Sequence, residues 1–133
     1  MRKALDISAY LVIGPENTLG RPVAEIIRQA LEAGFTCVQI RSKECSARDL
    51  IAYTAQAAEV ISQMGKSDTV TLLVDDRLDV VLAAREAGVK VDGIHVGQTD
   101  IPVEVCRKLL GPDSIVGLSA RADEMLEYVK TAD

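Results

Sequence analysis

The segment around position 40 places two cationic side chains beside an amide. The run Gln39-Ile40-Arg41-Ser42-Lys43-Glu44 spans the end of an apolar stretch with the character of a strand. Strand alternation puts Gln39, Arg41 and Lys43 on one side, two residues apart. A planar guanidinium and a compact ammonium suit a phosphate or pyrophosphate. The competing interpretation is a solvated, charged loop.

Carboxylates follow the next two apolar stretches. Asp75-Asp76-Arg77 comes after the first, and Gly97-Gln98-Thr99-Asp100 comes after the second. Each carboxylate alone is also suited to capping the helix that follows it. Together with the cations, they place opposite charges around one opening at the carboxyl ends of the strands. That arrangement can hold Mg²⁺ on a pyrophosphate, because oxygen ligands take the metal and cations take the remaining phosphate charge. Gly117-Leu118-Ser119 offers a hydroxyl on the same face.

The single histidine, His95, lies between Ile94 and Val96 in an expected strand. This setting favours a packed, hydrogen-bonded residue over a catalytic base. No nucleophile–base pair is evident, because no Cys or Ser has a second histidine to serve it. The chain also has no P-loop and no G-x-G-x-x-G motif, so nucleotide binding of those types is not supported.

Predicted strands and helices alternate along the chain, and these elements must position the residues named above. Apolar, β-branched runs predict strands at 9–13, 36–41, 70–74, 93–96 and 114–118. Amphipathic stretches predict helices over 22–34, 46–65, 78–87, 102–110 and 123–130. The second helix is expected to begin at the capping box Ser46-Ala47-Arg48-Asp49, and the first four helices are expected to end at glycines. About five βα units imply a parallel sheet with right-handed crossovers.

A chain of 133 residues fits one domain, spanning 1–133. Five βα units of this size match a complete flavodoxin-like, doubly wound parallel sheet. They equally match about five-eighths of a (βα)₈ TIM barrel. Periodicity does not separate the two folds, and both place functional residues at the carboxyl ends of the strands.

The composition excludes several classes of partner. With 48% hydrophobic and 26% charged residues, the chain is globular. A net charge of −5 argues against nucleic acid or an anionic membrane as the main partner. Only 3% of residues are aromatic and none is Trp, so a stacking platform for single-stranded nucleic acid has almost nothing to be built from.

Cysteine usage indicates a reducing compartment. Cys37, Cys45 and Cys106 are scattered and odd in number, which argues against a zinc site or a disulfide framework. The apolar run Ala9–Ile13 is too short for a signal core, and no stretch is long enough to span a bilayer. We therefore expect a soluble, cytoplasmic protein with free thiols.

Taken in order, the motifs resemble those of the thiamine-phosphate synthase family. They are Gln39–Lys43, Leu73–Arg77, Gly93–Asp100 and Gly117–Ser119. The run from Asp75 to Ser119 resembles the family almost continuously, and the resemblance covers essentially the whole chain. Four motifs in order at matching spacing are far more specific than any one of them.

The resemblance implies a (βα)₈ barrel that joins a hydroxymethylpyrimidine diphosphate to a thiazole phosphate with Mg²⁺ and releases pyrophosphate. By position, Gln39, Arg41 and Lys43 hold the pyrimidine diphosphate, and Ser119 touches the pyrimidine. Asp76 and Asp100 bind Mg²⁺. Asp75, a further diphosphate contact by position, stands where the family usually has Asn. A carboxylate there would repel phosphate unless it were protonated or turned to the metal.

The family's chain has about eight βα units, whereas five are recognisable here. The resemblance therefore implies an N-terminal portion that keeps the diphosphate–Mg²⁺ half-site and lacks most of the thiazole phosphate site. We expect such a chain to be inactive alone and to self-associate through its open barrel edge.

Two other interpretations remain open. One is the related thiazole tautomerase, disfavoured because Arg121 replaces that enzyme's histidine. The other is a non-catalytic, flavodoxin-like domain that binds an anion through Arg41 and Lys43.

Overall fold

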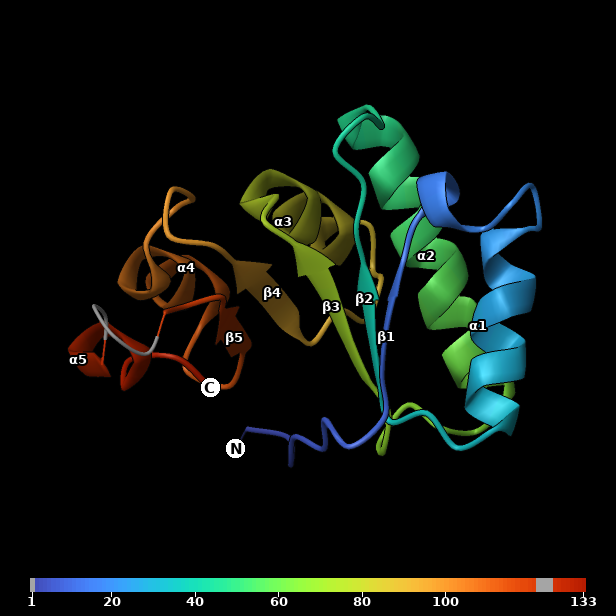
Figure 1. Cartoon of the computed structure of the whole chain (residues 1–133), viewed down its shortest axis with the longest axis horizontal. Helices are drawn as coiled ribbons and strands as arrows, with labels where there is room; N and C mark the ends of the chain where they lie inside the picture. The colour runs from blue at the N-terminus through green and yellow to red at the C-terminus, as the bar shows by residue number, and fades with distance from the viewer. Residues whose placement is uncertain (1, 122–125) are drawn as a thin grey trace.

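Five parallel strands lie side by side in the order in which they follow one another along the chain (Figure 1). The computed structural model describes residues 2–121 and 126–133. The strands are β1 (Tyr10–Ile13), β2 (Cys37–Ile40), β3 (Thr71–Asp75), β4 (Gly93–Val96) and β5 (Ile115–Leu118). The predicted α/β class and the parallel sheet are confirmed.

Helices connect the strands. They are α1 (Val23–Glu32), α2 (Ala47–Gln63), α3 (Leu78–Glu86) and α4 (Val103–Leu110), and the 3₁₀ turn η1 (Pro15–Asn17) follows β1. A last helix was predicted over 123–130. Its first positions lie outside the described residues, and α5 (Leu126–Val129) is the part that the structure describes.

Local sequence signals explain where the helices begin and end. The Ser46 hydroxyl accepts a hydrogen bond from the Asp49 backbone N–H at 3.1 Å, which confirms the predicted start of α2. After α1, Gly34 adopts a φ of 98°, a left-handed conformation that side chains with a Cβ disfavour.

All four long helices pack on one face of the sheet. One continuous core joins them to alternate strand residues, which are Ile13, Val38, Ile40, Leu72, Val74, Ile94, Val96 and Val116. From the helices, residues such as Ile27, Leu50, Val80 and Cys106 complete this core. Each fully buried aliphatic side chain of this kind stabilises the fold by about 1.5–3 kcal/mol.

The flavodoxin-like alternative is wrong. A doubly wound sheet reverses its strand order and carries helices on both faces. Here the order is β1-β2-β3-β4-β5, and within the described residues the helices cover one face only. The described strands form a singly wound, open sheet. Closure into a barrel, and self-association through an open edge, stay predictions.

The opposite face of the sheet carries the polar residues. Near the amino ends of the strands, Cys37, Leu73 and Ile115 form a small apolar cluster with Leu5 and Tyr10 packed against it. Beyond this cluster the face is open, and the residues of the predicted site lie there. All three cysteines are free thiols, as predicted. Among residues 2–121 and 126–133, no helix is long and apolar enough to cross a bilayer.

Candidate functional site

Strand register aligns three positions in one row across the open face. Asp75 is paired with His95, and His95 is paired with Gly117. A Cβ at Gly117 would lie 2.6 Å from His95 Nδ1, so the imidazole lies against the glycine backbone. From there, His95 Nε2 reaches the Ser119 hydroxyl at 2.8 Å. The sequence predicted the strand position of His95 but not this partner.

A hollow of about 400 Å³ opens over this row. Its lining residues are Tyr10, Val12, Gln39, Arg41, Asp75, His95 and Ser119. Gln39 is only 5% exposed, and its Nε2 donates a hydrogen bond to the Tyr10 hydroxyl at 2.9 Å. Burial raises the pKa of Tyr10 to about 12, so the phenol is neutral. Gln39 is thereby held in a fixed orientation at the floor of the hollow.

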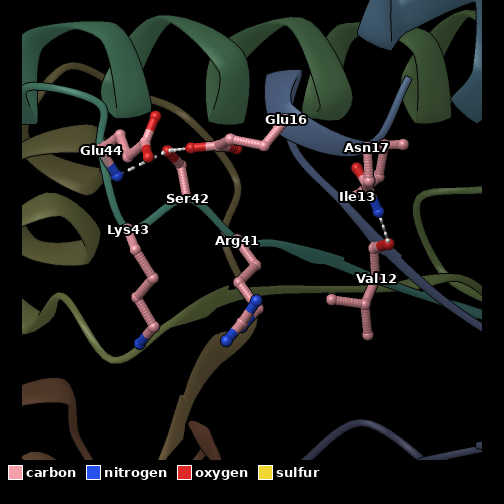
Figure 2. A pocket seen from close by; sticks show the side chains of 8 residues that line it. All are labelled: Val12, Ile13, Glu16, Asn17, Arg41, Ser42, Lys43 and Glu44. Carbon is pink, nitrogen blue, oxygen red and sulfur yellow. Dashed lines mark hydrogen bonds between the residues drawn. The ribbon is translucent and has the colours of Figure 1, made fainter. Parts of the chain in front are cut away.

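The two cations project from the loop that follows β2. Figure 2 shows Arg41 and Lys43 pointing to one side of this loop and Ser42 to the other, as the strand alternation predicted. On that other side, the Ser42 hydroxyl donates to Glu16 and accepts from the backbone N–H of Cys45 at 3.0 Å. Both contacts fix the loop from which the cations extend. Arg41 and Lys43 also line a second, smaller hollow of about 220 Å³ (Figure 2).

Both cations are paired with carboxylates of β3 and its following turn. Lys43 Nζ lies 3.2 Å from Asp75 Oδ2 and also bonds the Asp76 carboxylate. Arg41 Nε lies 3.6 Å from the same Asp75 oxygen. The carboxylates of Asp76 and Asp75 raise the pKa of Lys43 and keep it charged. The two cations are thus paired as well as exposed, with 50% of the Arg41 side chain and 55% of the Lys43 side chain accessible to solvent. A solvated, charged loop stays the competing interpretation.

Asp76 occupies an unusual backbone conformation. Its φ is 53°, in the left-handed region that Asp and Asn tolerate better than most side chains. Its N–H donates to the His95 carbonyl at 2.7 Å, and the Arg77 N–H donates to the Asp75 carbonyl at 2.8 Å. This tight turn holds the Asp76 carboxylate at Lys43. Neither Asp75 nor Asp76 caps α3, whose first turn has no side-chain cap.

Asp100 lies in the loop after β4. Its Oδ2 accepts a hydrogen bond from the Gly97 N–H at 2.7 Å, which closes the loop on itself, and it does not cap α4. In the described part of the chain, no group of three or more His, Cys, Asp or Glu side chains is placed to hold a metal ion. The predicted pair Asp76 and Asp100 thus forms no all-protein cage.

The donor set still fits Mg²⁺. This ion is usually bound by one or two carboxylates, with substrate phosphates and water completing an octahedron. The half-buried carboxylates of Asp76 and Asp100 are oxygen donors of the required kind. A diphosphate that enters beside Arg41 and Lys43 would supply further oxygen ligands.

Burial favours the neutral form of the histidine. Burial lowers the pKa of His95, and the charges of Asp75 and Asp100 oppose that shift only in part. A neutral imidazole exchanges one hydrogen bond with Ser119, in a direction set by the tautomer. The Ser119 carbonyl accepts a second bond from Gln98 Nε2 at 2.6 Å.

The structure therefore brings together most of the predicted site. Gln39, Arg41, Asp75 and Ser119 line one hollow, and Lys43 joins it through Asp75. Neither of the two predicted metal ligands, Asp76 and Asp100, is among the lining residues. Sequence reasoning missed Tyr10, although alternation in β1 places Tyr10 and Val12 on the open face.

The fold and this charged row define a singly wound, parallel α/β protein whose candidate site lies where its strands end. A model of the family described as thiamine monophosphate synthase matches residues 9–133. The chain belongs to this family, as its motifs suggested.

Relatives agree with this assignment. The chain is 42% identical to the thiamine-phosphate synthase of Moorella thermoacetica over 84% of its own length and 49% of that protein. It is 38% identical to the Corynebacterium efficiens enzyme of the same name, over 96% of this chain and 56% of the relative. A solved structure, thiamine phosphate pyrophosphorylase from Pyrococcus furiosus, superposes with a TM-score of 0.76 at 29% identity, over 96% of this chain and 57% of that one. The chain thus spans about half the length of the curated relatives it matches.

Proposed function

We propose that this chain carries the Mg²⁺–diphosphate half of a thiamine-phosphate synthase site. The reaction transfers a hydroxymethylpyrimidine group from its diphosphate to thiazole phosphate and releases pyrophosphate. The observation that carries the proposal is the pairing of Arg41 and Lys43 with Asp75 and Asp76 where β2 and β3 end. The names of the matched relatives support it.

Each residue has a proposed role. Gln39, Arg41 and Lys43 bind the pyrimidine diphosphate, and Ser119 contacts the pyrimidine. Asp76 and Asp100 hold Mg²⁺, which supplies positive charge to the leaving pyrophosphate when bound. We assign Asp75 a positioning role, because its one carboxylate pairs with both cations at the edge of the hollow that it lines.

The proposed reaction depends mainly on electrostatic stabilisation of the leaving group and on the positioning of the substrates. The bond from the pyrimidine methylene carbon to the diphosphate oxygen breaks, and negative charge grows on the leaving group. Arg41 and Lys43 stabilise that charge. The thiazole nitrogen then donates its electron pair to the electron-deficient methylene carbon. Cations that already contact the diphosphate before its bond to carbon breaks lower the barrier most, because they need no further reorganisation in that step.

We further propose that the open sheet is the first part of a (βα)₈ barrel and that residues 1–133 belong to one domain. The sequential strand order and the single helix-covered face support this proposal. The share of the Pyrococcus furiosus structure that the chain covers, 57%, agrees with it.

Calorimetric titration with inorganic pyrophosphate tests the function. We expect wild-type protein to bind pyrophosphate much more tightly with Mg²⁺ than without it. Arg41→Met and Asp76→Asn should each weaken binding about tenfold or more, since each removes a charged contact. Arg28→Met serves as a matched control, because Arg28 is exposed on α1 and its guanidinium bonds Gln63. Equal binding with and without Mg²⁺ would contradict the proposal.

A further inference from the structure

In the ligand-free chain, the charged side chains of the candidate site are paired with one another. Two cations, Arg41 and Lys43, face two carboxylates, Asp75 and Asp76, so the four formal charges cancel. The Lys43 ammonium is the group shared between the carboxylates, since it contacts both. It therefore lies where a cation bound by Asp76 would experience its charge most strongly.

Exposure differs between the two sides of this contact. The side chains of Asp75 and Asp76 are only 11% and 16% exposed, whereas Lys43 is 55% exposed. Carboxylates this buried need a cation beside them, because water alone solvates them poorly. Lys43 is the partner that can move, since its charge sits on a flexible four-carbon stem that extends into solvent.

We propose that Lys43 is the resident counter-ion of Asp76, and that it must leave this carboxylate before a divalent cation can bind there. The inference rests on the proposed function only in taking a diphosphate as the anion that then receives Lys43. It concerns the behaviour of Lys43 in the ligand-free chain.

This exchange couples the binding of the divalent cation to the binding of the diphosphate. A divalent cation arriving alone separates Lys43 from Asp76 and leaves its ammonium sharing the Asp75 carboxylate with Arg41, beside another positive charge. A diphosphate arriving alone meets Asp75 and Asp76. When both arrive together, Lys43 moves from Asp76 to a phosphate oxygen and every charge keeps a partner. Each ligand should therefore raise the affinity for the other by the same factor, and couplings of this kind are about 5–150-fold.

Metal binding without any diphosphate separates this idea from an ordinary substrate-binding role for Lys43. Mn²⁺ is the probe, since it accepts the same oxygen ligands and its free form is counted by electron paramagnetic resonance. Removing a residue that only binds substrate would leave Mn²⁺ affinity unchanged. Removing a resident counter-ion should improve it. We expect Lys43→Met and Lys43→Gln to bind Mn²⁺ alone at least fivefold more tightly than wild type.

The chain offers a matched control. Lys90 has the same 55% side-chain exposure and lies near an aspartate, with Nζ 3.7 Å from Asp68. Lys90→Met removes the same charge away from the site and should leave Mn²⁺ affinity within twofold of wild type. If Lys90→Met and Lys43→Met gained Mn²⁺ affinity equally, the gain would come from the change in net charge alone, and the inference would be wrong.

A second titration tests the coupling. Pyrophosphate should tighten Mn²⁺ binding in wild type at least fivefold more than in Lys43→Met. If both Lys43 variants bind Mn²⁺ alone no better than wild type, the inference is wrong whether or not pyrophosphate binds. If they bind Mn²⁺ more tightly but wild type fails to bind pyrophosphate with the metal, the counter-ion role stands and the proposed function fails.

Discussion

His95 Nε2 lies 2.8 Å from the hydroxyl of Ser119, a contact that links β4 to the residue just after β5. The contact depends on Gly117, because any Cβ there would occupy the space of the imidazole. Ser119 is held a second time through its carbonyl, which accepts from Gln98. A serine proposed to contact substrate is thus positioned from two sides.

The first prediction concerns His95 and pH. Burial lowers the pKa of this imidazole in the folded chain, with Asp75 and Asp100 opposing in part. The unfolded chain therefore binds a proton more readily at His95, beginning below about pH 6.5. The free energy of unfolding should fall as pH drops through that region, until the folded-state pKa is also passed. His95→Gln should lack this component.

Urea denaturation of wild type and His95→Gln at pH 8, 7, 6 and 5 measures the effect. The difference between the two free energies of unfolding isolates the contribution of His95 from that of the rest of the chain. We expect wild type to lose stability relative to His95→Gln on acidification. A difference that stays constant from pH 8 to 5 would refute the assignment.

The second prediction compares two fully buried threonines. The Thr71 hydroxyl has no hydrogen-bond partner within the described residues, whereas the Thr54 hydroxyl donates to the Leu50 carbonyl at 2.7 Å. A buried hydroxyl without a partner destabilises a fold. Thr71→Val should therefore leave the free energy of unfolding unchanged or raise it by about 1 kcal/mol. Thr54→Val should lower it by about 0.5–1.5 kcal/mol.

Chemical denaturation of both variants at one pH provides the measurement. Valine matches threonine in shape, so each substitution changes the hydroxyl and little else. An equal loss of stability in both variants would mean that Thr71 has a partner after all.

Local sequence patterns were sufficient to predict the helices and strands. Ser46 marked the start of α2, and the β-branched run at 70–74 marked β3 within one residue. Strand alternation also predicted which side of the loop Arg41 and Lys43 occupy. These features depend on neighbours within a few residues, where the sequence carries the signal directly.

The sequence predicted that the cations and the carboxylates lie at the same end of the sheet, but not which side chains pair. The contact of His95 with Ser119 depends on the register of β4 and β5, and that of Lys43 with Asp75 depends on the register of β2 and β3. No single strand encodes that register by itself. Periodicity likewise left the choice between a doubly wound and a singly wound sheet open, since that choice depends on which strands become neighbours, and the family resemblance favoured the barrel type.

The last prediction separates the charge of Asp76 from its backbone. At a φ of 53°, a residue with an ordinary side chain is strained by about 1–2 kcal/mol, whereas Asn and Gly tolerate this region. Asp76→Asn and Asp76→Gly should therefore fold about as stably as each other. Asp76→Ala should be less stable than Asp76→Gly by about 1 kcal/mol.

Metal binding by these three variants should not follow their order of stability. Each lacks the carboxylate, so each should lose pyrophosphate-dependent Mn²⁺ binding to a similar extent, measured by electron paramagnetic resonance. Asp79→Asn is the control, since Asp79 is exposed on α3 and pairs with Arg77. It should keep wild-type metal binding. If Asp76→Asn retained Mn²⁺ affinity while Asp76→Ala lost it, the conformation of the turn and not its charge would be the feature that the metal requires.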